Sequence, residues 1–355
     1  MAGVLAGVRG IKDGRAVPYF EEVLLSDPLM PHMWHVIGRD QDFGSQPAAA
    51  RLLDLDLVVW RTADGAIHAA QNLCMHRASA FVADGLQAEV VDDCLECPYH
   101  ALLYDRNGVC TSIPQAPSAK IPITARLNMV HARAAYGWVW VCLDEPRHAI
   151  PPFGEWGDPQ FQLVHWQRLG IAASAPRVAE NFLDVAHLGK VHPGLLGDPA
   201  QLELQPFSAQ LTPDRGVVAT PIRLYQPDPD GTGKPGFVTY EYCAPGPLSA
   251  YFSKQTQGDD GAGGHFAIYF TVTPVSRALS NAYMIICLDY GHESDDAVRA
   301  FQDIIFDQDT PIVQAQKPEL LPLTRLADEW SMWFDAISIQ YRQWLRRLGV
   351  TYLAY

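Results

Sequence analysis

The sequence predicts an α+β protein with an all-β domain first and a domain of antiparallel strands and helices after it. Its 355 residues suit about two domains of roughly 150 residues each. Short strands separated by turn dipeptides fill the region from about 33 to 145, whereas longer strands and amphipathic helices follow from 203 onward. We therefore expect an N-terminal segment over residues 1–32 and two domains over 33–148 and 149–355.

The strands of the first domain are indicated by apolar runs and by the turns between them. Residues 57–60 form an apolar run, and Asp64-Gly65 is a hairpin signal after it. Asn107-Gly108 repeats that signal, and residues 138–143 close the region as a strand. Prolines at 146, 151 and 152 then interrupt regular structure and mark the domain boundary.

The second domain is predicted to hold an antiparallel sheet over residues 203–290, with the Gly-rich piece 258–264 as a loop between strands. A helix is expected before the sheet, from about 177 to 189. The final helix is expected over 327–348, with Gly349 as the residue just beyond its end.

A further helix is predicted to start at Ser294, which is a suitable N-cap residue. Its apolar residues are spaced so that they share one face. They are Val298, Phe301, Ile304 and Ile305.

Composition excludes several classes of function. The net charge of −14 argues against a nucleic-acid partner, because phosphate binding depends on clustered Lys and Arg. No apolar run approaches the roughly 20 residues that span a bilayer, and the N-terminus lacks the pattern of a secretory signal. The seven scattered cysteines are a poor disulfide framework and favour a reducing cytoplasm.

The first group of candidate ligands comprises Cys74, His76, Cys97 and His100. Each half supplies one thiolate and one imidazole, which meets the demand of a Rieske [2Fe–2S] cluster, where two histidines replace two cysteines on one iron. The alternative is a structural zinc site with the same four ligands. Zinc motifs usually pair Cys with Cys, and Cys94 does form a C-x-x-C pair with Cys97.

These residues resemble the Rieske domain of the ring-hydroxylating oxygenases. The resemblance is carried by Cys74-Met75-His76-Arg77, Asp84-Gly85, Cys97-Pro98-Tyr99-His100 and Tyr104-Asp105. The chain has Ala101-Leu102 where the family usually has Gly-Trp, and Ala78 where it commonly has Gly. These differences affect packing around the cluster and leave the ligands intact.

The second group of candidate ligands lies at 181–192. Asp184 and His187 are three residues apart, so on a helix they share one face, and His192 lies beyond Gly189, where a helix can end. Two imidazoles and one carboxylate form the facial triad of non-haem Fe(II) oxygenases. The alternative is that the two histidines are surface or capping residues. However, Asn181-x-x-Asp184-x-x-His187-x4-His192 resembles the iron motif of the same oxygenase family and follows the first motif in the same order.

The third ligand must be a carboxylate from far along the chain, and the candidates are Asp303, Asp307 and Asp309. Residues 306–313 resemble the late helix on which the family places its distal Asp, which favours Asp309, with Asp307 next. The alternative is that Asp309 caps a helical turn that begins at Pro311.

The resemblance also implies how the two groups work together. In this family the subunits form a head-to-tail homotrimer, and an Asp links a cluster histidine of one subunit to an iron histidine of the next. Asp184 matches that position, between His100 of one chain and His187 of its neighbour, and Asn181 is expected to support the site by hydrogen bonding. The alternative is that Asp184 is a helix-surface residue.

The implied activity is that of a cytoplasmic Rieske non-haem iron monooxygenase, with a [2Fe-2S] cluster and Fe(II), acting on a small organic substrate with O2. The sequence has no dinucleotide-binding fingerprint, so a separate reductase, with or without a ferredoxin, must supply the electrons. The resemblance is to the branch with α subunits alone, which includes O-demethylases, and it implies a START-like helix-grip catalytic domain. Two alternatives are a ring cis-dihydroxylating dioxygenase and an electron carrier or ligand-binding protein without catalytic iron.

Overall fold

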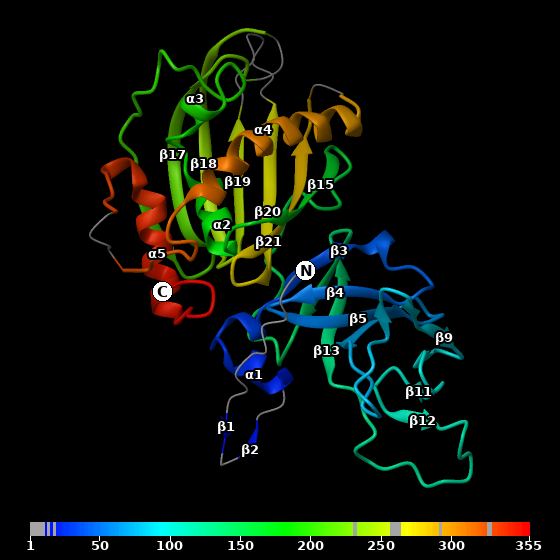
Figure 1. The fold of residues 1–355 in the computed structure, drawn as a ribbon. Helices are drawn as coiled ribbons and strands as arrows, with labels where there is room; N and C mark the ends of the chain where they lie inside the picture. Colours follow the sequence, from blue (N-terminus) through cyan, green and yellow to red (C-terminus); the bar gives the residue numbers. More distant parts are fainter. Residues whose placement is uncertain are drawn as a thin grey trace. The chain divides into compact units, whose positions relative to one another are not determined.

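The computed structural model describes residues 11–12, 15–16, 19–229, 233–255, 264–290, 293–324 and 329–355. The chain forms two compact units, Met1–Ala149 and Ile150–Tyr355. Figure 1 shows both, with the first unit running from blue through cyan to green and the second from green to red. Each unit is described by itself below.

The first unit is built from two antiparallel sheets. The larger has the strand order β3-β14-β13-β6-β5-β4, with bounds His35–Arg39, Trp138–Cys142, Met129–Ala135, Ile67–Gln71, Leu55–Arg61 and Ala48–Leu52. The smaller has the order β12-β11-β10-β9, with bounds Cys110–Ser112, Leu103–Tyr104, Cys94–Glu96 and Glu89–Val91. Short elements complete it: β1 (Ile11–Lys12), β2 (Arg15–Ala16), α1 (Tyr19–Leu25), η1 (Met30–His32), η2 (Asp40–Asp42), β7 (Val82–Ala83) and β8 (Leu86–Gln87).

The two predicted hairpins of this unit are confirmed. Strands β5 and β6 pair with Arg61 opposite Ile67, and Gly65 adopts the positive φ that the turn requires. Strands β11 and β12 flank the second turn, where Gly108 also has a positive φ. The all-β character of the first domain is therefore as the sequence predicts.

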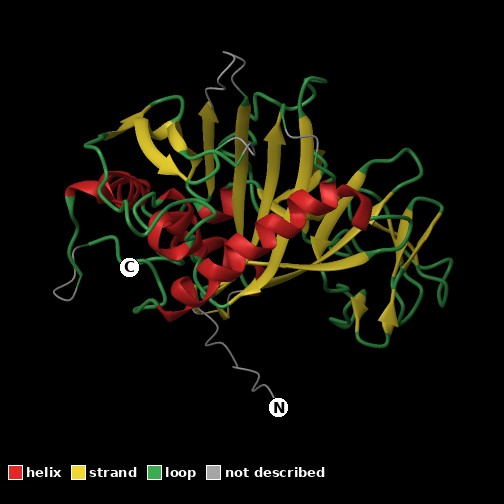
Figure 2. Ribbon diagram, turned by 90° about the horizontal axis from the view of Figure 1, so that it is seen from above, coloured by secondary structure: helices red, strands yellow, loops and turns green. Residues whose placement is uncertain are grey.

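The second unit contains one seven-stranded antiparallel sheet with the order β15-β21-β20-β19-β18-β17-β16. The strands are Gln162–Ile171, Leu279–Leu288, His265–Ser276, Ser249–Gln255, Gly236–Gly246, Gly216–Gln226 and Ala209–Thr212, in that order. The helices are α2 (Ala175–Leu183), α3 (Leu188–Val191), α4 (Asp295–Ala315) and α5 (Ala336–Leu348), with η3 (Trp333–Asp335) before the last. Figure 2 shows the helices gathered along one face of the long strands.

Aromatic contacts hold the helices on this face of the sheet. Phe182 of α2 stacks on Phe270 of β20 with 4.4 Å between ring centroids. Phe306 of α4 packs on Trp166 of β15 with 4.9 Å between centroids. Because side chains alternate between the two faces of a strand, every second residue of the central strands faces these helices. This arrangement confirms the predicted α+β class.

A buried ion pair fixes α2 against α5. Arg342 of α5 donates hydrogen bonds to both carboxylate oxygens of Glu180, with 2.7 Å from Nη2 to Oε2. Glu329 also accepts from Arg342. Burial raises the pKa of Glu180, and the guanidinium of Arg342 opposes that shift. Helix α2 is thereby anchored a few residues before the second group of candidate ligands.

The structure corrects two predicted helices. Helix α4 does begin after Ser294, whose hydroxyl accepts from the backbone N–H of Ala297 at 3.2 Å. However, Phe301 and Ile304 are 44% and 52% exposed, and the buried face instead carries polar Gln302 and Asp309 among its apolar residues. The prediction holds for Ile305, which is buried, and Phe301 lines the cavity, but the buried face is rotated toward Gln302, Phe306 and Asp309. A site occupies that side, so polar residues lie where the apolar pattern expects none.

The last helix starts later than predicted, at Ala336, because residues 329–332 are not helical and η3 precedes it. Its end is as predicted, with Gly349 in the left-handed conformation. Most of the predicted loop 258–264 lies outside the described residues. None of the described helices is long and apolar enough to cross a membrane.

Candidate metal centres

The first candidate site is formed by two loops of the same shape. One follows β6 and carries Cys74, and the other joins β10 to β11 and carries Cys97. In each loop the cysteine N–H donates to the carbonyl five residues on, at 2.8 and 2.9 Å. In each, the cysteine carbonyl accepts from the N–H four residues on, which belongs to Ala78 or Ala101 at 2.9 Å. The repeated turn gives each loop the same presentation of its Cys and His.

The sulfurs of this site lie inside and the imidazoles lie toward its edge. Cys74 and Cys97 are 2% and 1% exposed, and neither is in a disulfide. The rings of His76 and His100 lie 4.7 Å apart between centroids. A hydrogen bond from the Cys97 thiol and one from the Tyr104 hydroxyl, the latter at 3.3 Å, lower the pKa of Cys74, and the same contact with Cys74 raises the pKa of Cys97. Two adjacent buried sulfurs beside two accessible imidazoles suit a cluster with mixed ligands.

Cys94 does not join this group. It lies on β10 and is partly exposed, and its sulfur contacts Thr111 Oγ1 at 3.9 Å. The thiols of Cys74 and Cys97 interact with each other, and Cys94 is not among the groups that shift the pKa of either, so the C-x-x-C pair in the sequence is not the pair of interacting thiols.

The two positions where the chain lacks the family's usual glycine are both strained. Ala78 and Ala101 each have φ of 55°, a left-handed conformation that costs a residue with a Cβ roughly 1 kcal/mol relative to glycine. We expect Ala101→Gly to raise the free energy of unfolding by about 1 kcal/mol, measured by denaturant titration of the loaded protein. Ala116→Gly, on an exposed loop without a positive φ, is the control and should bring no gain. Equal effects of the two variants would contradict the role of strain.

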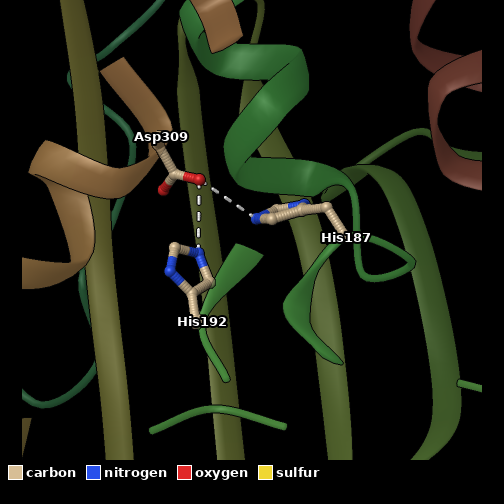
Figure 3. A group of neighbouring side chains, drawn as sticks. All are labelled: His187, His192 and Asp309. Atoms are coloured by element: carbon tan, nitrogen blue, oxygen red, sulfur yellow. Dashed lines mark ion pairs between the residues drawn. The ribbon is translucent and has the colours of Figure 1, made fainter. Parts of the chain in front are cut away.

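The second candidate site brings together His187, His192 and Asp309, whose ligand atoms all lie within 4.8 Å of one another. Figure 3 shows both rings directed at the same carboxylate oxygen of α4. The distances to Asp309 Oδ1 are 3.4 Å from His187 Nε2 and 3.2 Å from His192 Nε2. Apart from these contacts with one another, His192 Nε2 and Asp309 Oδ1 are buried and have no further hydrogen-bond partner among the described residues. Ligand atoms that converge in a buried place and meet only one another suit a metal ion held by two His and one carboxylate.

The chain bends at Asp184, just before these histidines, which corrects the predicted helix over 177–189. Helix α2 ends at Leu183, and Asp184 is extended, with φ −80° and ψ 121°. Its carboxylate accepts from the N–H of Ala186 at 2.8 Å, a local hydrogen bond that competes with helix continuation. His187 and His192 then flank the short helix α3, and Gly189 lies inside it rather than ending a helix.

Close packing explains the glycine inside α3. A Cβ on Gly197 would lie 2.5 Å from the Cα of Gly189, so the segment after His192 runs directly against this helix. Two glycines therefore allow the chain to fold back and bring His192 opposite His187.

The other carboxylates proposed for this site lie elsewhere. Asp303 and Asp307 face Arg168 on β15, with 3.3 and 2.8 Å between the charged atoms. Asp309 is not a cap of the turn at Pro311, because α4 continues through that proline to Ala315. Asn181 lines the cavity beside the site, but its side chain has no hydrogen bond among the described residues.

At the second site the histidines and the carboxylates stabilise each other's charged forms. Burial disfavours the imidazolium of His187, but hydrogen bonds to Asp184 and Asp309 outweigh it and raise its pKa to about 9. Burial likewise opposes ionisation of Asp309, and the two histidines nevertheless lower its pKa. In the metal-free protein a proton on His187 therefore occupies the place that a cation takes.

A cavity of about 340 Å³ opens on this site. Its sheet-side wall is mainly aromatic and consists of Tyr240, Tyr242, Phe252, Phe266, Ile268 and Phe270. Polar side chains, including Gln226 and Lys254, lie in the same lining. The cavity has the size and character of a site for a small, largely apolar molecule.

Comparison with known proteins agrees with both sites. Residues 33–126 match the Rieske [2Fe-2S] domain, and residues 171–351 match the vanillate O-demethylase oxygenase C-terminal domain. The methylxanthine N1-demethylase NdmA of Pseudomonas putida is 30% identical over 344 residues, covering 92% of each chain. The chain belongs to the Rieske-type oxygenases. The methylxanthine N3-demethylase NdmB of the same organism is 28% identical and again covers 92% of each chain.

Solved structures of Rieske oxygenases have the same fold as this chain. A mutant of NdmA from Pseudomonas putida CBB5 with caffeine superposes with a TM-score of 0.75 at 26% identity, covering 92% of this chain and 91% of that one. Dicamba monooxygenase bound to dicamba has a TM-score of 0.74 at 18% identity, which is a likeness of fold alone.

Membership in the Rieske oxygenases fixes the cofactors and the type of reaction. The protein is an oxygenase with a [2Fe-2S] cluster and a mononuclear non-haem iron, and it acts on a small organic substrate with O2. The zinc alternative for the first site and the carrier without catalytic iron are thereby excluded.

One residue of this oxygenase site was missed by the sequence analysis. Gln308 Oε1 lies 2.7 Å from Nδ1 of the fully buried His192 and fixes the ring, as Asp184 does for His187 at 3.2 Å. The only sign in the sequence is that Gln308 precedes Asp309. That sign is weak, because Gln308 and His192 are 116 positions apart and only the fold brings them together.

Proposed function

We propose that this protein is the oxygenase component of a demethylase that removes an N- or O-methyl group from a small planar substrate. The observation that carries the proposal is the aromatic cavity that opens directly on His187, His192 and Asp309. The named demethylation activities of relatives that match most of the chain support it. Insertion of oxygen into the methyl C–H bond consumes O2, two electrons and two protons and gives water and a carbinol, which loses formaldehyde.

Four residues are proposed to hold the [2Fe–2S] cluster: Cys74, His76, Cys97 and His100. The buried sulfurs and the paired imidazoles of two equivalent loops support this assignment. When bound, the cluster delivers electrons and the mononuclear iron activates O2. The accessible histidine side of the loops is the side from which a second protein reaches the cluster.

His187, His192 and Asp309 are proposed to hold the mononuclear iron. Three protein ligands on one side leave the other positions open toward the cavity. Asp184 and Gln308 accept the Nδ1 protons of the two rings, so Nε2 of each ring bears the lone pair that faces the metal. Asn181 is proposed to support the site from the cavity wall.

We further propose that the chain forms a head-to-tail homotrimer in the cytoplasm. In this assembly Asp184 hydrogen bonds His187 of its own chain and His100 of a neighbouring copy. The contact from Asp184 to His187 at 3.2 Å and the accessible position of the cluster loops support this proposal. We also propose that the chain divides into a Rieske domain over 33–148 and a catalytic domain over 149–355.

The reaction is tested by assaying the loaded oxygenase with a surrogate reductase on a panel of methyl ethers and N-methyl heterocycles. We expect O2 consumption that depends on substrate and is matched by formaldehyde release. A cis-diol product without formaldehyde would instead assign ring dihydroxylation.

Gln308 supplies a prediction on metal affinity. Gln308→Leu keeps the side-chain size but removes the acceptor for His192 Nδ1, so the ring is free to turn. We expect the affinity for Co2+ or Fe2+ at the mononuclear site to fall about tenfold to a hundredfold, measured by equilibrium dialysis. Gln314 lies on the same helix, and its side-chain carbonyl accepts from the backbone N–H of Ala172 at 2.9 Å rather than from a histidine, so Gln314→Leu is the matched control and should retain affinity. Unchanged affinity of Gln308→Leu would exclude the positioning role.

The raised pKa of His187 predicts how metal binding depends on pH. Metal requires the neutral imidazole, so below a pKa of about 9 each binding event must release the His187 proton. The apparent affinity of the metal-free protein for Co2+ should therefore rise about tenfold per pH unit between pH 7 and 9 and level off above. Calorimetry in two buffers of different ionisation enthalpy measures the released proton, and zero release at pH 7 would contradict the expectation.

A further inference from the structure

The sheet wall of the cavity consists of rows of side chains that run across the strands. In one row Tyr242 of β18 lies opposite Phe252 of β19. In the next row Tyr240 lies opposite Lys254, and Lys254 lies opposite Phe266 of β20. Residues two apart on a strand are separated by roughly 6.7 Å, so the second row lies about one aromatic ring beyond the first.

The row with Tyr242 is the one near the metal site. Phe182, near the end of α2 and two residues before Asp184, packs on this row, with ring centroids 6.4 Å from Tyr242 and 5.5 Å from Phe252. The other row continues from Phe266 through Leu288 to Gln162. The side chain of Gln162 bonds Asp295 in the first turn of α4, about 20 Å along that helix from Asp309. Tyr240 and Lys254 therefore stand at the end of the cavity away from the mononuclear site.

This far end carries hydrogen-bond donors. The hydroxyl of Tyr240 accepts from Gln226 Nε2 at 2.8 Å, and among the described residues no acceptor takes its own proton. Burial keeps that hydroxyl protonated, so it remains a donor. Lys254 is 8% exposed, and its ammonium lies 3.2 Å from Gln226 Oε1 and 2.9 Å from the carbonyl of Pro229. Gln226 thus holds Tyr240 and Lys254 together as one polar cluster in an aromatic wall.

The aromatic surroundings of this end favour a neutral ligand group over an anion. Asp228, next to Pro229, also lines the cavity, with its side chain exposed and its Oδ1 accepting from the N–H of Gly233. A carboxylate ligand would have to lose its hydration among aromatic side chains, whereas a carbonyl oxygen accepts hydrogen bonds there at a smaller cost of desolvation. The rings of Phe252 and Phe266 stack with 5.9 Å between centroids and join the two rows into one aromatic surface of the cavity.

We propose that Tyr240 and Lys254 form the recognition site for a carbonyl oxygen of the substrate. The substrate class is then a planar methylated ring that bears a ketone, amide or ring carbonyl about one ring away from the methyl group. This assignment rests on the proposed demethylase function and specifies which molecules it accepts. Gln226 is the positioning residue of the pair.

The test compares three probes that share a methoxyphenyl body. They are 4-methoxyacetophenone with a neutral carbonyl, 4-methoxybenzoate with a carboxylate and 4-ethylanisole with neither. Binding to the holoenzyme is measured by anaerobic calorimetry, without turnover. We expect the ketone to bind about tenfold more tightly than 4-ethylanisole and more tightly than the carboxylate. Equal binding of ketone and 4-ethylanisole, tighter binding of the carboxylate, or no binding of any probe would overturn the proposal.

Two variants assign the effect to the residues. Tyr240→Phe removes only the donor and should reduce the ketone preference to within about twofold, and Lys254→Met should act in the same direction. Tyr242→Phe is the matched control, on the same strand and face one row nearer the metal, and should keep the preference. A preference unchanged in Tyr240→Phe and Lys254→Met would also refute the assignment. If the protein is not a demethylase, the turnover assay will release no formaldehyde, and this outcome is distinct from a failure of the binding test.

Discussion

Asp309→Ala is expected to remove the mononuclear iron and to lower turnover by more than about a hundredfold, since a ligand matters at least as much as its hydrogen-bond partners. The carboxylate is the one group in the second site that carries a fixed negative charge toward both histidines, at 3.2 and 3.4 Å. Without it, two imidazoles remain, and they hold Fe2+ weakly. Analysis of the purified variant should find about two irons per chain, in place of about three in the unaltered protein. The sulfide content should be about two per chain in both proteins.

Asp307→Ala is a close control for this prediction. It changes the same residue type on the same helix two positions earlier, where the carboxylate is exposed and pairs with Arg168 at 2.8 Å. A surface pair of this kind contributes little to stability, so this variant should keep its iron and its turnover. Loss of iron from Asp307→Ala, or retention of three irons in Asp309→Ala, would show that the distal ligand is misassigned.

The fold class could be predicted from the sequence because its signals are local. Asp64-Gly65 forms the β5–β6 hairpin, and Ser294 caps α4 through a hydrogen bond to a residue three positions away. The ligand motifs are local as well, since Cys74 with His76 and His187 with His192 lie within a few residues of each other. The sequence selected Asp309 by resemblance, and the structure brings that residue to the two histidines.

What the sequence could not provide depends on tertiary contacts. The bend at Asp184 depends on whether its carboxylate bonds the N–H of Ala186 or leaves the helix to continue, and periodicity does not distinguish the two. Gln308 looks like a surface glutamine until the fold places it on His192. The face of α4 was predicted only in part for the same reason, because Gln302 and Asp309 are buried at the cavity and the site, where apolar periodicity gives no signal for polar residues.

The left-handed conformation of Ala78 and Ala101 could not be predicted from the sequence either. The sequence showed only that two usual glycines are absent, and it indicated a change in packing. The structure shows that the effect lies in the backbone, at the same position of two equivalent turns. The chain therefore tolerates strain in both loops, which the hydrogen bonds around Cys74 and Cys97 must offset.

Asp184→Asn is expected to leave about three irons per chain and nearly abolish turnover, with a loss of more than about a hundredfold. The amide keeps the shape of the side chain and its bond to the N–H of Ala186, but it loses the negative charge beside His187. Asp198→Asn is the control, because Asp198 makes the same kind of local bond to Ala200 at 2.8 Å without a histidine contact. The measurement is the rate at which a chemically reduced cluster is reoxidised by O2 and substrate, and a normal rate in Asp184→Asn would refute the linking role.

Mixed assemblies separate a role between subunits from a role within one. Cys97→Ser removes a cluster ligand and should inactivate the protein while leaving Asp184 and the mononuclear site intact. In a head-to-tail ring, a chain with Asp184→Asn but an intact cluster can serve a neighbour with Cys97→Ser but an intact Asp184. Co-expression of the two inactive variants should therefore restore a measurable fraction of turnover, detected as formaldehyde release. If electron transfer stayed within one chain, every chain in the mixture would carry a defect and no activity would return, so the mixture decides whether Asp184 acts between copies.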